Sequence, residues 1–385
     1  MKNFLKNLMT LLSYILVAAV AVCATLFITQ QTPTGVSKLD QLENLLLNNF
    51  IGEADKTKME DAAAKAMVSA LGDRWSYYIS AAEYASYEEG KKNAYVGIGV
   101  TISQEEAGYR IQKVTEGGPS EEAGLLPGDL IIAAGGTSVA GLDVNEGKAL
   151  IQGKEGTAVN ITVLRDGEEL TFTVQRRTIK TPVATAAMLE GNIGLITIAN
   201  FNANCASETV AAMESLMEKG AVALIFDVRN NGGGYASEMV KLLDHILPEG
   251  ELFRTVNYKG EESVDMSDAD CVEIPMAVLV NEASYSAAEF FAVALHEYQW
   301  ATVVGTQTSG KGHYQVTYKL SDGSAVGLSI GKYFTPSGIS LEGIGITPEV
   351  YVEVDEATFA AIHAGTLDPM EDPQILAAIA ALAGE

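Results

Sequence analysis

The sequence predicts a multidomain α/β protein in which a small, mostly β module lies between an N-terminal helical region and an α/β core. Short runs with a period of two, separated by Gly, Pro and Asp-Gly turns, extend from residue 95 to about residue 180. After Pro182, strand-like runs alternate with helical patterns, which is typical of a parallel sheet with crossover helices. With 48% hydrophobic and 19% charged residues, the 385-residue chain is expected to fold into two or three domains.

The first residues predict a membrane anchor. Lys2 and Lys6 precede residues 8–28, an uncharged and mostly apolar run that would be about 31 Å long as a helix and could span a bilayer. We expect residues 1–29 to form an uncleaved anchor with its lysines in the cytoplasm and the rest of the chain outside. A cleaved signal peptide is the alternative, because residues 19–21, Ala-Val-Ala, offer a small-x-small site.

Three segments follow the anchor. Residues 30–93 hold a linker and two helical patterns, "LDQLENLLLNNF" and "KMEDAAAKAMVSAL". Residues 94–179 form the β module, with the runs "VGIGVTI", "YRIQKV", "DLIIAAGG", "VNITVLRDG" and "LTFTVQRR". Residues 180–385 form the α/β core and a helical tail, in which "VALIFDV", "MAVLVN" and "ATVVG" read as strands. Because parallel strands end at one edge of a sheet, the loops after the first two should be neighbours.

Composition excludes several partners. The net charge of −25, from 50 acidic and 25 basic residues, makes nucleic acid an improbable ligand. No Cys-x-x-C pair is present and the four histidines are scattered singly, so no metal or other cofactor is expected. Cys205 and Cys271 could form a disulfide in an oxidising compartment or remain buried thiols, and the sequence does not decide between the two.

One serine-rich loop has two interpretations. In "VNEASYSAAEFF", Ser286 followed by Glu289 fits a Ser-x-x-Glu capping box, which would only start a helix. Ser286 could instead be a nucleophile, since the helix N-terminus would present the Ala287 amide to developing negative charge. The neighbouring loop "RNNGGG", residues 229–234, is either a flexible turn or a second source of such amides.

A serine nucleophile needs a base, and Lys311 in "TSGKGHYQVTYKL" is the candidate. A following strand would place Lys311, His313 and Gln315 on one face. The lysine must be neutral to act, so its pKa has to fall from about 10.4 toward 7 to 8 through desolvation. Gln315 is uncharged, so it could hold the amine by a hydrogen bond without raising the pKa of Lys311 as a carboxylate would. An exposed loop lysine is the alternative.

A nucleotide-binding loop is a rival for the same stretch. Residues 305–311, "GTQTSGK", fit G-x-x-x-x-G-K and follow a strand. Gly312 nevertheless stands where Ser or Thr should hold magnesium, and the next residues alternate as a strand rather than forming a helix. We therefore reject the nucleotide interpretation.

Taken in order, these motifs resemble the carboxyl-terminal processing proteases, which are membrane-anchored or exported serine endopeptidases with an embedded PDZ domain. "LGDRWSYYIS" is similar to the family's Leu-Asp-Pro-x-Ser-x-Tyr segment, and "GGPSEEAGLLPGDLIIAAGG" to the PDZ hallmark. "GKYFTPSG" and "GIGITPE" resemble the C-terminal signature. The resemblance covers nearly the whole chain after the anchor and implies a ClpP/crotonase-like α/β core with an inserted PDZ domain.

The resemblance also implies roles for single residues. Ser286 matches the family nucleophile, Lys311 the general base and Gln315 the residue that orients the lysine. The glycine loop resembles the family's Asn-Asn-x-Gly-Gly segment, which implies that an amide near Gly233 or Gly234 joins that of Ala287 in the oxyanion hole. Glu289 then supports the helix start. Tyr285 and Ala288 depart from the family's common serine motif, and Tyr285 would narrow the pocket beside the nucleophile.

For the β module, the resemblance implies a sensor of protein C-termini. The loop Gly97, Ile98, Gly99 and Val100 would offer amides to a terminal carboxylate while the bound tail adds a strand. Expected substrates are extracytoplasmic proteins with apolar, unstructured C-termini, cleaved by an enzyme in the bacterial cell membrane that forms a homodimer. A catalytically weak protein that only binds chain ends is the alternative function.

Overall fold

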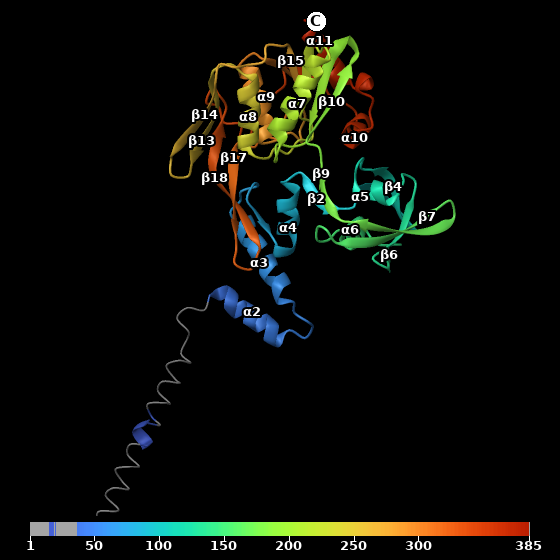
Figure 1. Cartoon of the computed structure of the whole chain (residues 1–385). Helices are drawn as coiled ribbons and strands as arrows, with labels where there is room; N and C mark the ends of the chain where they lie inside the picture. Colours follow the sequence, from blue (N-terminus) through green and yellow to red (C-terminus); the bar gives the residue numbers. More distant parts are fainter. Residues whose placement is uncertain (1–14, 19, 21–36, 385) are drawn as a thin grey trace, which may run out of the picture. The chain divides into compact units, whose positions relative to one another are not determined.

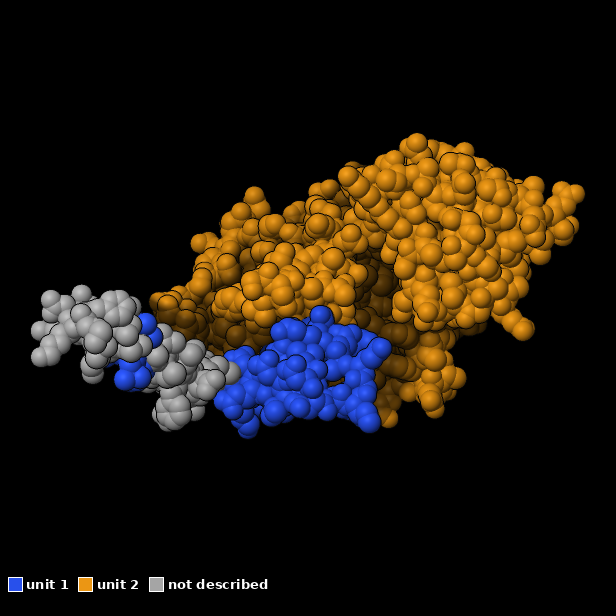
Figure 2. Space-filling view, turned by 90° about the horizontal axis from the view of Figure 1, so that it is seen from below, with its two compact units in different colours: residues 1–72 blue, residues 73–385 orange. Residues whose placement is uncertain are grey.

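Residues 15–18, 20 and 37–384 are described in a computed structural model of the chain, which forms two compact units, residues 1–72 and 73–385 (Figures 1 and 2). Most of the predicted anchor therefore lies outside the described residues. Within the described part, no helix is both long and apolar enough to cross a membrane.

The first unit contains the two helices that the sequence predicts. Helix α2 covers Lys38–Asn49 and α3 covers Lys56–Ser69. Ser37 starts α2 with a reciprocal capping box, because its hydroxyl accepts from the Asp40 amide while Asp40 accepts from the Ser37 amide. Neither helix buries a residue, and α2 exposes a row of leucines.

A six-stranded sheet forms the centre of the α/β core within the described residues. The sequence predicts such a core with parallel strands, but not the number of strands. Its order is β10, β11, β12, β15, β16 and β19; β10 pairs antiparallel with β11, and the other neighbours are parallel. Apolar strands buried on both faces need covering layers on both sides. The strand bounds are Ala184–Leu189, Ile193–Ile198, Ala223–Asp227, Met276–Val280, Ala301–Gly305 and Val350–Tyr351.

Helices cover both faces of this sheet (Figure 1). Helices α7, α8 and α9 pack on one face around Phe226 and Phe291, whose rings meet edge to face. Helix α11 packs on the other face through Ile375 and Ala378. The helices of the core are α7 Cys205–Glu218, α8 Ala236–Ile246, α9 Ala287–Glu297, α10 Glu356–Ala364 and α11 Pro373–Leu382, with 3₁₀ turns at Glu190–Asn192 and Pro369–Glu371.

A second sheet carries the segment that follows the candidate base. Strand β18 pairs with β1, β13 and β17, and β13 pairs with β14. All of its neighbouring pairs are antiparallel. The bounds are β1 Tyr77–Ile79, β13 Gly250–Asn257, β14 Glu262–Ser267, β17 His313–Lys319 and β18 Ala325–Phe334, and helix α4 spans Ala81–Gly90.

The β module has its own sheet and its own core around Tyr109, Ile131 and Ile161. Strand order is β3, β4, β5, β7 and β8, with β6 beside β5, so β3 is an edge strand. Strand β2 pairs with β9, which brings the two ends of the module together. The bounds are β2 Ala94–Gly97, β3 Val100–Glu105, β4 Gly108–Val114, α5 Pro119–Ala123, β5 Leu130–Ala134, β6 Thr137–Ser138, α6 Val144–Ile151, β7 Ala158–Arg165, β8 Glu168–Gln175 and β9 Arg177–Lys180.

Both cysteines within the described residues are free thiols. Cys205 is fully buried in the core, and burial raises its pKa to about 12. Cys271 is half-buried. Of the two alternatives that the sequence left open, the structure therefore contains unpaired cysteines.

Among the described residues, no group of three His, Cys, Asp or Glu side chains has a geometry that would hold a metal ion.

Candidate active site

Ser286 lies at a sharp turn between strand β15 and helix α9. It is the N-cap of α9, with φ 60° and ψ −127°, a backbone conformation that a residue with a side chain rarely adopts. Such strain costs about 1 to 3 kcal/mol and is concentrated at functional sites. A similar strained turn from strand to helix presents the nucleophile in α/β-hydrolases.

The nearby Ser284 has a structural role. Its hydroxyl donates to the Val228 carbonyl at 2.8 Å and accepts from the Asn281 amide at 3.0 Å, and the side chain is fully buried. These bonds tie the serine loop to the end of strand β12. Of the two serines in the loop, only Ser286 lies at the helix start.

Glu289 joins the loops of Ser286 and Lys311. Its Oε2 accepts hydrogen bonds from the amides of both residues, at 2.9 Å from Ser286 N and 2.8 Å from Lys311 N. Oε1 accepts from Thr308 Oγ1 at 2.5 Å and from Gly310 N at 2.7 Å. The carboxylate is fully buried, and these four bonds compensate for its desolvation. One acceptor atom thus holds the backbones of the candidate nucleophile and the candidate base side by side.

The amine of Lys311 lies among aromatic rings. Nζ is 4.9 Å from the Trp75 ring centroid and 5.8 Å from that of Tyr285, and it forms no ion pair or hydrogen bond with any described residue. Desolvation by burial lowers the pKa of Lys311 to about 8, against the opposing charges of Asp73 and Glu342. A substantial fraction of the amine is therefore neutral near physiological pH.

Gln315 forms no hydrogen bond with Lys311. Its Nε2 donates to the His313 carbonyl at 3.1 Å and to Ser329 Oγ at 3.0 Å. The expectation that all three residues share one strand face is wrong for Lys311, because β17 begins only at His313. The glutamine lies on the same strand as predicted, but its amide is hydrogen-bonded within the sheet.

The glycine loop lies directly against the serine loop, as the parallel topology predicts. Asn230 N donates to Asn281 Oδ1 at 2.9 Å, and Asn281 Nδ2 donates back to Asn230 Oδ1 at 3.0 Å. Gly233 has φ 82°, and a Cβ there would lie 2.8 Å from Ser286 Cβ and 3.0 Å from Ala287 N. Only glycine allows this close approach.

Within the same loop, one of the expected oxyanion donors is already hydrogen-bonded. The Gly233 amide donates to Asn231 Oδ1 at 2.8 Å, so it is already engaged. By contrast, the amides of Gly234 and Ala287 have no hydrogen-bond partner among the described residues. For Ala287 this is the normal state of a first helical residue. Of the three expected donors, the amides of Gly234 and Ala287 therefore remain for an oxyanion.

The β module contains a groove of about 310 Å³ at its edge strand. Gly97, Ile98, Gly99 and Val100 all line it, as do residues of β3 and of helix α6. Gly99 has φ 76°, which turns the chain between β2 and β3. A free strand edge beside an apolar groove is the arrangement that binds an extended peptide by strand addition.

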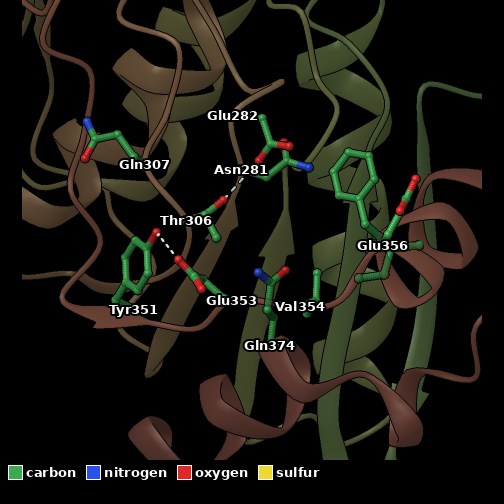
Figure 3. Close-up of a pocket in the computed structure, with 11 residues that line it drawn as sticks. Asn281, Glu282, Thr306, Gln307, Tyr351, Glu353, Val354, Glu356 and Gln374 are labelled. Carbon is green, nitrogen blue, oxygen red and sulfur yellow. Dashed lines mark hydrogen bonds between the residues drawn. The ribbon is translucent and has the colours of Figure 1, made fainter.

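A further cavity of about 470 Å³ opens at the end of the central sheet on the side of Asn281 and Glu282 (Figure 3). Glu353 and Glu356 also line it, and the Tyr351 hydroxyl donates to Glu353 at 3.0 Å. Ser286 and Lys311 are not among its lining residues. This cavity is therefore separate from the candidate catalytic pair.

Sequence reasoning assigned no role to three features of this site. Trp75 covers the lysine, Asn231 holds the glycine loop, and Arg229 forms buried ion pairs with Asp227 and Asp372. An Asp-x-Arg at the end of a buried strand was the available signal for the last of these, since buried charges are normally paired.

The rejection of a nucleotide loop is supported, because strand β17 follows Lys311 and the Gly310 and Lys311 amides already bind Glu289.

Comparison with known proteins shows to which class of protein the chain belongs. The sequence model of peptidase family S41 matches residues 192–352, and that of the PDZ domain matches residues 96–175. The chain is 34% identical over 356 residues to the carboxy-terminal processing protease CtpA of Bacillus subtilis (strain 168), covering 89% of this chain and 76% of the relative. It is 32% identical over 350 residues to a CtpA-like serine protease of Staphylococcus aureus (strain COL), covering 88% and 70%.

A solved S41 protease from Bacteroides fragilis NCTC 9343 shares the fold, with a TM-score of 0.54 at 15% identity over 92% of this chain and 99% of that chain. These findings define a serine-type peptidase that carries a PDZ domain. The chain belongs to peptidase family S41, among the carboxy-terminal processing proteases.

Proposed function

We propose that the protein cleaves other proteins near their C-termini with Ser286 as nucleophile and Lys311 as general base. The observation that carries this proposal is the shared acceptor Glu289 Oε2, which binds the amides of both residues. The lowered pKa of Lys311, about 8, supports a neutral amine that can accept the serine proton. Gln315 is retained as a residue that orients the lysine once substrate is bound.

In the first step, Lys311 Nζ takes the proton of Ser286 Oγ while Oγ attacks the scissile carbonyl carbon. The carbonyl oxygen becomes an oxyanion, which the amides of Ala287 and Gly234 would stabilise. The carbon–nitrogen bond then breaks, and the protonated lysine returns its proton to the leaving amine. Water then gives a proton to the same lysine and attacks the acyl carbon. The ester bond to Ser286 Oγ breaks, and the lysine returns the proton to that oxygen.

We further propose that the PDZ groove binds the C-terminal tail of the substrate. Amides of the loop from Gly97 to Val100 would hold the terminal carboxylate, and the tail would pair with the free edge of β3. The groove contains Ile98, Val100 and Ile151, which supports a preference for apolar tail residues.

We also propose that residues 1–29 anchor the enzyme in a bacterial membrane, with the catalytic part outside the cytoplasm, and that it forms a homodimer. The uncharged run at residues 8–28 and the preceding lysines support the anchor. Exposed leucines along α2, including Leu42 and Leu45, support the pairing of subunits.

The test uses a protein substrate with a disordered apolar C-terminus. We expect Ser286→Ala and Lys311→Ala to lower the cleavage rate by about 10³-fold or more, since the two residues act as one unit. Ser284→Ala is the matched control and should keep most of the activity if the protein remains folded. Equal cleavage by Ser286→Ala would exclude the proposal. Tail binding without cleavage by the wild-type protein would favour the alternative, a catalytically weak binding protein.

A further inference from the structure

Trp75 and Tyr285 form an aromatic pair that the proposed mechanism does not use. Their rings stack with centroids 6.0 Å apart and planes 30° apart, and both rings lie within 6 Å of Lys311 Nζ. Both residues are half-buried, so part of each ring remains accessible. The pair therefore presents apolar surface directly beside the candidate base.

The surrounding loops hold the Trp75 ring and the backbone of Tyr285 in place. Trp75 Nε1 donates to Glu342 Oε1 at 3.0 Å, and the Trp75 amide donates to Asp73 Oδ1 at 3.2 Å. On the other side, the Tyr285 amide donates to the Asn231 carbonyl at 3.1 Å. Its hydroxyl lies so close to Gly232 that a Cβ there would be 2.5 Å from it. Little ordering is then needed when a ligand packs against the rings.

The direction of proton transfer indicates what this surface contacts. Lys311 takes the proton from Ser286 and must return it to the nitrogen of the leaving amine. That nitrogen therefore has to come within hydrogen-bond reach of Nζ. It belongs to the residue just after the scissile bond, so that residue must lie beside the rings that flank Nζ.

We propose that Trp75 and Tyr285 line the subsite for the residue just after the scissile bond, and that this subsite selects a large apolar side chain. The inference rests on the proposed Ser286–Lys311 mechanism. The guanidinium of Arg74 lies 4.1 Å from the Trp75 centroid, so a basic side chain would meet like charge. An acidic side chain would pair with protonated Lys311 and hold the base in its charged form.

The nearby carboxylates do not reverse this preference. Glu342 Oε2 accepts from the Gly312 amide at 2.8 Å while its other oxygen binds Trp75. Asp73 accepts from Ser76 Oγ at 2.5 Å. Because both groups already have donors, they are poorly available to a basic substrate residue. Apolar contact with the two rings remains as the main favourable interaction.

The experiment measures kcat/KM of the full-length protein in detergent with matched substrates that differ only after the scissile bond, carrying Phe, Ala, Glu or Lys there. We expect Phe to exceed each of the others by about tenfold or more. Trp75→Ala and Tyr285→Ala should bring the Phe-to-Ala ratio close to one. Trp75→Phe and Tyr285→Phe should preserve it, and Tyr258→Ala, which removes an exposed aromatic ring elsewhere, is the matched control.

A wild-type enzyme with no preference for Phe would overturn the inference, as would an unchanged ratio in active alanine variants. If both alanine variants are inactive, the wild-type ratio and the two Phe variants decide. Ser286→Ala is measured in parallel. Cleavage by that variant would show that the proposed catalytic pair is wrong, whereas its inactivity with a flat wild-type preference would remove only the subsite.

Discussion

Ser286 combines a strained backbone with its expected chemical role. At φ 60° and ψ −127°, glycine fits the turn better than serine or alanine does. We therefore expect Ser286→Gly to be more stable than Ser286→Ala by about 1 to 2 kcal/mol, although neither variant should cleave substrate. Urea unfolding monitored by circular dichroism measures the difference. Equal stability of the two variants would mean that the turn is not strained.

Glu289 provides a second prediction at the residue scale. Glu289→Gln keeps the size of the side chain but replaces one oxygen by an NH₂ group, which cannot accept from an amide. One of the two pairs of donors that the carboxylate now binds would then be left unsatisfied. We expect a loss of stability of about 2 kcal/mol or more and a fall in kcat of at least about 10²-fold.

Glu282→Gln, in the same loop but exposed, is the matched control and should change neither quantity appreciably. If Glu289→Gln retained full kcat while losing stability, the carboxylate would support only the fold. The sequence predicted that Glu289 braces the helix start, but its bonds to residues 308–311 depend on tertiary contacts that no local spacing reveals.

Regular elements with a strong apolar pattern were predicted correctly. Helix α9 and strands β12, β15 and β16 all lie where the sequence predicts them, because a buried face imposes its period on the residues. The run at residues 96–102 is interrupted, since Gly99 turns the chain between β2 and β3. A glycine also interrupts the predicted strand near Lys311. Gly310 has φ 76°, and the strand starts only two residues after the lysine.

One long-range ion network links elements that the sequence shows as unrelated. Arg229, after β12, binds Asp227 at 2.6 Å and Asp372, the N-cap of α11, at 2.7 Å. Removing one member leaves buried charge unpaired, so Arg229→Met should cost about 3 to 5 kcal/mol of the free energy of unfolding. Arg254→Met, which breaks more exposed pairs with Glu251 and Glu262, should cost about 1 kcal/mol or less. Similar losses in the two variants, measured by chemical denaturation, would contradict the importance of burial.

On the scale of the whole molecule, the proposed function assigns two recognition surfaces to one cleavage reaction. The edge groove of the PDZ domain is suited to a chain end, and the paired loops of the core are suited to an internal peptide bond. Such a division requires a substrate tail that is unfolded over some length. The ordered motifs predicted both modules correctly, and they also predict the catalytic pair that we propose. It could not predict which amides remain free or what covers the lysine, because these depend on contacts between distant loops.

The most direct test of the central claim is the pH dependence of kcat/KM between pH 6 and 10 for the wild type and Lys311→Met. Burial lowers the pKa of Lys311 to about 8, and only the neutral amine accepts a proton, so activity should rise with pH and level off above an apparent pKa of about 8. The kcat/KM of Lys311→Met should be lower than that of the wild type by about 10³-fold or more at every pH. A flat wild-type profile, or a Lys311→Met variant that retains the activity and its rise, would contradict a neutral lysine as the base.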